Sequence, residues 1–216
     1  MTFARQLTKK EKTALLRLEE FVRNAHANSD SHDYAHVLTV CKNAIKIAQN
    51  IRDPVDPFIL TCGALLHDIG KSVPNYARIH GLFGGAIAEE FLDGQNFNQE
   101  TILAVTRVVI RHTMSSFIPP ETIEEKIVAD SDLLDRFGVM GIVRGLVGKT
   151  DRSMGEIITY YYQKNGQDID RFHFEYSKKI AQQKLEETRP FIEKIQQRLA
   201  ERLDSIEDMF EKEKLI

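Results

Sequence analysis

The chain has 216 residues, of which 42% are hydrophobic and 28% charged, and its formal net charge is −3 at pH 7. This composition is typical of a soluble globular protein, and the negative charge argues against long nucleic acid as a partner. The longest apolar run is too short to cross a bilayer, and the two cysteines, Cys41 and Cys62, form neither a disulfide framework nor a zinc motif. We therefore expect a cytoplasmic protein without a membrane partner.

Helical spacing of apolar residues recurs along the chain, and strand-like alternation is almost absent. In chain order, the spacing predicts helical segments within 15–22, 37–48, 54–71, 81–92, 98–112, 121–138 and 138–149. The segment 153–164 fits a helix or a strand. The tail from Lys178 is the longest helical stretch, and Pro190 is expected to kink or restart it. Its heptad spacing suits a coiled coil, but a core-facing amphipathic helix is favoured.

The predicted fold class is all-α, a single-domain helical bundle that spans residues 1–216. Its core is expected over about residues 28–150, with C-terminal helices at 153–213 packing on it.

A histidine and an aspartate, His67 and Asp68, directly follow an apolar run in the segment "ALLHDIGK". Consecutive residues point about 100° apart on a helix, so the pair can grip one ion only at the helix edge, near Gly70. His36 opens an amphipathic helix on its inward face, and His32 precedes it by one turn. Imidazole together with carboxylate suits Mn²⁺, Fe²⁺, Co²⁺ or Ni²⁺ better than Mg²⁺.

Three aspartates, Asp130, Asp132 and Asp135, interrupt the apolar pattern of "IVADSDLLD". At least one of them should face inward, although in isolation solvated or helix-capping roles are slightly favoured for these acids. His26 and His173 lie in polar or isolated contexts, and we expect no metal at either.

The order of His36, the His67–Asp68 pair and an aspartate in "VADSDLLD" resembles the HD superfamily of metal-dependent phosphohydrolases. The resemblance covers most of the chain, including "SHDYAHVLTV", "IHGLFGGAIAEEFL" and "IEEKIVADSDLLDRFGVMGIVRGL", and the tail resembles the bacterial single-domain, nucleotide pyrophosphatase-like branch. It implies a bundle of the HD-domain type. It also implies the metal ligands His36, His67, Asp68 and Asp132, with Asp130 as the fallback for Asp132.

Some branches of the family hold two metals, with added histidines at the places of His80 and His112. Dinuclear relatives often have two adjacent histidines at the second place, where this chain has Thr113 after His112. The resemblance therefore favours one tight divalent ion (Mn, Co, Ni, Fe or Mg), with two as the alternative.

The family often has an arginine where this chain has Thr39, so another cation must bind phosphate here. Lys71 is the first choice, and Arg111 is a further candidate beside Arg144. The catalytic residues expected are Asp68 and Lys71. The substrate is expected to contact Lys71, His80, His112, Arg144 and His32. Asp33 and Asp135 are expected to orient a ligand histidine.

The activity implied is hydrolysis of a small phosphorylated substrate, a nucleotide above all, by attack of a metal-bound hydroxide on phosphorus. Phosphatase, pyrophosphatase and phosphodiesterase activities all fit. One alternative is a non-catalytic regulatory module that binds metal or nucleotide, and another is a structural helical dimer built on the tail. Both a monomer and a homodimer are compatible with the sequence.

Overall fold

The computed structural model describes residues 3–27, 33–72, 79–113, 116–148, 153–202, 206–212 and 214. Over these residues the chain is helical, and the extended pairing is confined to an isolated bridge between Phe3 and Val55. The predicted all-α class is confirmed. None of the described helices has the length and apolarity needed to cross a membrane.

The helices follow one another with short connections. In order they are α1 (Lys9–Ala25), α2 (Tyr34–Gln49), α3 (Pro57–Leu66), η1 (Ile69–Ser72), α4 (His80–Gly94), α5 (Gln99–Arg111), α6 (Ile123–Asp135), α7 (Val139–Gly148), α8 (Met154–Asp168), η4 (Ile169–Arg171), α9 (Glu175–Ala200) and α10 (Ile206–Lys212).

Several helices begin where the sequence supplies a cap. Thr8, Thr122 and Ser153 each form a capping box with a glutamate three residues later. The box at Ser153 explains why segment 153–164, which fits a helix or a strand by its apolar pattern, begins a helix.

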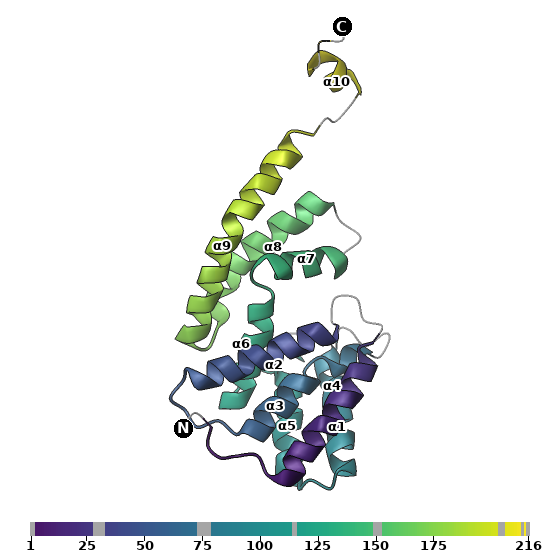
Figure 1. The fold of residues 1–216 in the computed structure, drawn as a ribbon, viewed down its shortest axis with the longest axis vertical. Coiled ribbons are helices and arrows are strands. Elements are labelled where there is room, and N and C mark those ends of the chain that lie inside the picture. The colour runs from purple at the N-terminus through teal and green to yellow at the C-terminus, as the bar shows by residue number, and fades with distance from the viewer. Residues whose placement is uncertain are drawn as a thin grey trace.

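The bundle of α1–α5 occupies one end of the molecule, and α7, α8 and α9 form a layer at the other end (Figure 1). Helix α6 joins the two parts because it packs against α2, α3 and α5 and also against α9. The last helix, α10, lies beyond the end of α9, away from the bundle (Figure 1).

Helix α3 lies at the centre of the bundle, between two groups of buried apolar side chains. Leu60 and Ala64 pack with side chains of α2 and α6, whereas Phe58 and Leu66 pack with α1, α4 and α5. A helix that is apolar all round needs this position, because no face of it can be exposed to water. The end of α3 is therefore deep inside the protein.

Helix α9 runs without interruption from Glu175 to Ala200 and contains Pro190. Of the two expected effects, a kink or a restart, the restart at this proline is excluded. Pro190 lies on the exposed side, where water can bind the carbonyl that the proline leaves without a partner. Ala181 and Ile192 are buried, as expected for a core-facing helix.

Candidate metal centre and the adjoining cavity

The pair His67–Asp68 lies where α3 ends. His67 is the C-cap residue of α3, and Asp68 directly precedes the tight turn η1, so the pair lies at the end of the helix, as the sequence predicted. Both residues are fully buried, at 0% exposure. A charged group at this depth requires partners, and the surrounding helices supply them.

Gly70 allows helix α4 to start close to this pair. A Cβ atom at Gly70 would lie 2.8 Å from the backbone nitrogen of Gly84 and still closer to the carbonyl oxygen of His80. A side chain at this position would therefore push the first turns of α4 away. The close approach brings the imidazole of His80 to Asp68.

His36, His67 and Asp132 form one group around the buried pair, with one ligand atom of each within 4.8 Å of the others. The Nε2 atoms of His36 and His67 are 3.2 Å apart. Oδ1 of Asp132 lies 3.4 Å from Nε2 of His36 and 4.0 Å from Nε2 of His67. These side chains come from α2, the end of α3 and α6.

Asp68, His80 and His112 form a second such group. Oδ1 of Asp68 lies 3.3 Å from Nε2 of His80 and 3.5 Å from Nε2 of His112. The other oxygen, Oδ2, faces the first group, at 3.4 Å from Nε2 of His36 and 3.5 Å from Nε2 of His67. The carboxylate of Asp68 thus lies between four imidazoles.

The ring nitrogens show that these groups fit a metal. A carbonyl oxygen only accepts, so Nδ1–H of His67 donates to Ala64 at 2.8 Å and Nδ1–H of His112 donates to Val109 at 2.6 Å. In a neutral ring this leaves the lone pair on Nε2, which faces the centre in both histidines. Ligand atoms about 2.1 Å from one ion lie roughly 3.0–3.4 Å apart, close to the separations found here.

The environment sets opposite charge states for His36 and His67. Burial lowers the pKa of His67 to about 3, so this ring is neutral. Burial alone would also lower the pKa of His36, but hydrogen bonds to Asp135 and Asp68 outweigh it and raise the pKa to about 9. Burial and the carboxylate of Asp68 oppose ionisation of Asp132, yet its electrostatic interactions with His67, His36 and Lys71 bring its pKa below the ordinary value.

Asp135 lies directly behind His36. Its Oδ2 accepts a hydrogen bond of 2.7 Å from Nδ1 of His36 and also pairs with the guanidinium of Arg144 on α7. Arg144, which the resemblance assigned to the substrate, contacts Asp135 and the ring of His36. Asp33, which was expected to orient a ligand histidine, caps α2. Its side chain accepts a hydrogen bond from the backbone N–H of His36, not from the imidazole.

The remaining predicted residues have mixed positions. Lys71 lies next to the candidate metal ligands, with its Nζ 2.8 Å from Oδ2 of Asp68. Arg111 is paired with Glu121 at 2.9 Å and donates to the carbonyl of Pro119. His32 lies outside the described residues.

Asp130 faces away from both groups. Its buried carboxylate accepts hydrogen bonds from the backbone N–H groups of His173 and Phe174 and contacts Nδ1 of His173 at 2.8 Å. It therefore fixes the connection that leads into α9. The geometry separates Asp130 from Asp132, although the two are only two residues apart.

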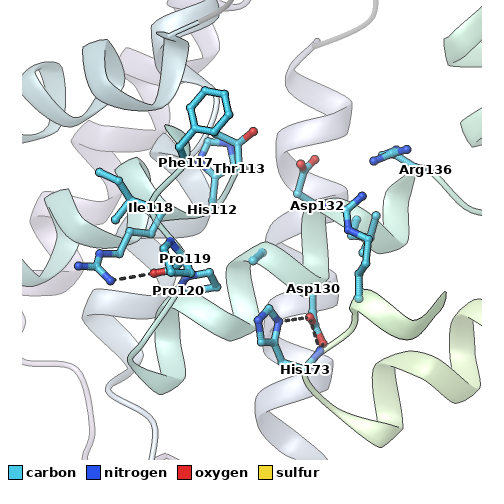
Figure 2. A pocket seen from close by; sticks show the side chains of 14 residues that line it. His112, Thr113, Phe117, Ile118, Pro119, Pro120, Asp130, Asp132, Arg136 and His173 are labelled. Atoms are coloured by element: carbon cyan, nitrogen blue, oxygen red, sulfur yellow. Dashed lines mark hydrogen bonds and ion pairs between the residues drawn. The ribbon is translucent and has the colours of Figure 1, made fainter. Parts of the chain in front are cut away.

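A cavity of about 670 Å³ opens beside the first group, and its walls include His112 and Asp132. One side carries the apolar segment Phe117–Pro120, and the opposite side carries Asp132, Arg136 and His173 (Figure 2). Phe117 is 93% exposed and has a positive φ of 58°, an unusual conformation for a bulky residue. The size suits a drug-sized or nucleotide-sized ligand.

Two cavity residues, Arg136 and Arg171, were missed by the sequence analysis. The signal for Arg136 was present, because it follows Asp132 by four residues and so lies on the same helical face. Arg171 gave no comparable signal, since it reaches the cavity only through the packing of η4.

Comparison with known proteins places the chain in a family. The HD domain family matches residues 33–136. An uncharacterised protein of Methanocaldococcus jannaschii is 30% identical over 135 residues, which are 56% of this chain and 76% of that protein. A tRNA (cytidine(56)-2′-O)-methyltransferase of Picrophilus torridus is 37% identical over 121 residues, 50% of this chain. That match spans only 32% of the methyltransferase.

Solved structures share the fold. Bacillus subtilis YpgQ in complex with ADP has a TM-score of 0.68 at 20% identity, covering 87% of this chain and 96% of that one. A predicted HD superfamily hydrolase from an uncultured Thermotogales bacterium has a TM-score of 0.60 at 24% identity, covering 86% and 91%. From the matched sequence, the buried histidine–aspartate groups and the shared helical fold, we conclude that the chain belongs to the HD superfamily.

Proposed function

We propose that this protein is a metal-dependent phosphohydrolase that acts on a small phosphorylated substrate, a nucleotide above all. One observation carries the proposal. The carboxylate of Asp68 lies between two histidine-containing groups, one of which is beside a cavity whose lining includes arginines.

Divalent ions would be held by the two groups, that is, by His36, His67, Asp68, Asp132, His80 and His112. The mixed imidazole and carboxylate donors suit Mn²⁺, Fe²⁺, Co²⁺ or Ni²⁺. When bound, such an ion would lower the pKa of water enough to supply hydroxide as the nucleophile at neutral pH, and it would offset negative charge on the phosphoryl oxygens.

We favour two ions over the single ion that the sequence suggested. The earlier preference depended on Thr113 standing where relatives have a second histidine. Here His80 supplies the second imidazole, because α4 lies against the turn after α3 and Nε2 of His80 is 3.4 Å from Nε2 of His112.

The surrounding side chains prepare the ligands. Backbone carbonyls fix the rings of His67 and His112, and Asp135 fixes the ring of His36, so that these imidazoles need no reorientation. Lys71 pairs with the carboxylate of Asp68 and places a positive charge beside it. Lys71 would therefore hold the carboxylate of Asp68 in place. It would contact a substrate phosphate only if that phosphate lies next to Asp68.

A nucleotide fits the two unlike sides of the cavity. The exposed ring of Phe117 and the neighbouring Pro119 and Pro120 offer apolar surface for a base, and arginines stand near the opposite side. The similarity in fold to a protein solved in complex with ADP supports a nucleotide as the ligand. Cleavage of a monoester and cleavage between phosphates both remain compatible with this arrangement.

The proposal is tested by assaying nucleoside mono-, di- and triphosphates with Mn²⁺, Co²⁺, Ni²⁺ and Mg²⁺. We expect turnover with at least one pair, and we expect Asp132→Asn to reduce it at least 1,000-fold at unchanged helical content. Asp53→Asn, at an exposed aspartate outside the site, is the matched control and should keep the wild-type rate. Metal binding without turnover on any substrate would instead indicate a regulatory metal- or nucleotide-binding module.

A further inference from the structure

Three cationic side chains surround one buried carboxylate at the edge of the cavity. Asp168, only 1% exposed, accepts from Arg171 at 2.7 Å, from Arg136 at 3.0 Å and from Lys164 at 3.1 Å. Burial opposes ionisation of Asp168, but the hydrogen bonds from Arg171 and Lys164 lower its pKa below the ordinary value. Two guanidinium groups and one ammonium group thus share the carboxylate of Asp168.

Two members of this cluster, Arg136 and Arg171, line the cavity. Their side chains are 30% and 33% exposed, so each guanidinium is fixed by Asp168 yet accessible to water. Fixing the side chain in advance reduces the entropy that a ligand must remove when it binds. Planar guanidinium groups also match the oxygen geometry of phosphates better than a lysine does.

The position of Arg136 relates the cluster to the metal centre. Arg136 is the C-cap residue of α6, four residues after Asp132, so the two lie on one face about one helical turn apart. Figure 2 shows Arg136 beside Asp132, on the side of the cavity opposite Phe117. If the inner phosphate of a substrate lies at Asp132, the next phosphate of the chain would be within reach of Arg136.

Other side chains of the cavity wall have acidic partners of their own. Arg111 pairs with Glu121 at 2.9 Å and lies 3.8 Å from Glu125. The ring of His173 contacts the carboxylate of Asp130. Arg136 and Arg171, by contrast, both contact the carboxylate of Asp168.

We propose that Arg136 and Arg171, held in place by Asp168, bind the outer phosphates of a substrate that carries two or more linked phosphates. This inference rests on the proposed function for the location of the inner phosphate at the metal centre. Asp168 is a positioning residue, because it acts through the two arginines. The pair selects for the length of the phosphate chain, whatever nucleoside is attached.

The test compares inorganic tripolyphosphate with orthophosphate by calorimetric titration of the metal-loaded protein. Mg²⁺ is kept in excess in the cell and the syringe, so that the phosphates do not strip metal from the protein. The variants are Arg136→Gln, Arg171→Gln and the double variant. Arg189→Gln is the matched control, because Arg189 is a half-exposed arginine of α9 that is likewise paired with an acid, Glu186.

We expect wild type and Arg189→Gln to bind tripolyphosphate at least tenfold more tightly than orthophosphate. The double variant should lose at least tenfold for tripolyphosphate and less than twofold for orthophosphate. Each single variant should lose at least threefold for tripolyphosphate, which keeps the test valid if the double variant does not fold.

Equal affinities in wild type and the folded variants, an equal loss for both phosphates, or a wild type that does not distinguish them would each overturn the inference. The result is separate from the hydrolysis assay. Chain-length selectivity that depends on the arginines, found in a protein without turnover, would refute the hydrolase and leave the binding pair standing. Turnover with unchanged selectivity in the variants would do the reverse.

Discussion

Asp135 contacts the candidate metal centre through one ring, that of His36. Its carboxylate accepts from Nδ1 of His36 and is itself held by Arg144. We expect Asp135→Asn to weaken Mn²⁺ binding 10- to 100-fold, because the amide favours the wrong orientation or tautomer of His36. Calorimetric titration with Mn²⁺ measures this, and Asp53→Asn should match wild type. An affinity within twofold of wild type would show that His36 needs no support from Asp135.

At the scale of single residues, the sequence and the family resemblance together named side chains that the structure brings close to one another, but not the contacts among them. His67 and Asp68 were found because two polar residues after an apolar run need partners. The position of Asp68 between two groups was not predictable, because it depends on how α4 and α5 pack around α3. The contact of Arg144 with Asp135 was not predictable either, because it depends on how α7 packs beside the end of α6.

At the scale of elements, the approach of α4 to η1 decides whether the second group forms. Gly70→Ala places a methyl group against the backbone of His80 and Gly84. We expect a loss of roughly 2–4 kcal/mol in the free energy of unfolding. We also expect fewer bound metal ions per chain, since the shift of α4 moves His80 away from Asp68.

Gly94→Ala is the matched control for this substitution. Gly94 is the last residue of α4, and nothing lies within 4 Å of a Cβ placed there. It should leave metal binding unchanged and stabilise slightly, by up to about 1 kcal/mol. Urea denaturation and metal analysis of both variants measure the two effects. A Gly70→Ala protein with wild-type stability and metal content would mean that α4 tolerates displacement.

The helices could be predicted from local sequence signals. Pro190 is also a local signal, but it did not mark the end of a helix. Capping boxes and apolar spacing depend on a few neighbouring residues and can be read directly. The effect of a proline inside a helix depends on whether the carbonyl it leaves faces water. That exposure is a property of the packed molecule.

At the scale of the whole molecule, one ion-pair network ties the N-terminal segment to the bundle. Arg5 bonds to both oxygens of Glu11, at 2.7 and 2.9 Å, and also to Asp56, the N-cap of α3. The hydrogen bond from Arg5 lowers the pKa of Glu11 from 4.5 to about 2. A carboxyl with a lowered pKa stabilises the fold above its unfolded pKa and loses that contribution as the pH falls.

We therefore expect Glu11→Gln to cost about 1–2 kcal/mol at pH 7, with the difference from wild type shrinking between about pH 5 and pH 2. Glu20→Gln, at an exposed glutamate of the same helix, should show neither effect. Urea denaturation at several pH values measures the difference. A difference that stays constant down to pH 2 would contradict the role assigned to the ionised Glu11.

The central claim is that Asp68 joins two metal-binding groups, and counting bound Mn²⁺ tests it most directly. The count is made on equilibrated wild type and Asp68→Asn, with helical content measured in parallel. The account predicts two ions per chain for wild type and fewer than one for a folded Asp68→Asn at the same free Mn²⁺. Wild type that binds no Mn²⁺ at millimolar free ion, or Asp68→Asn that binds as many ions as wild type, would contradict it.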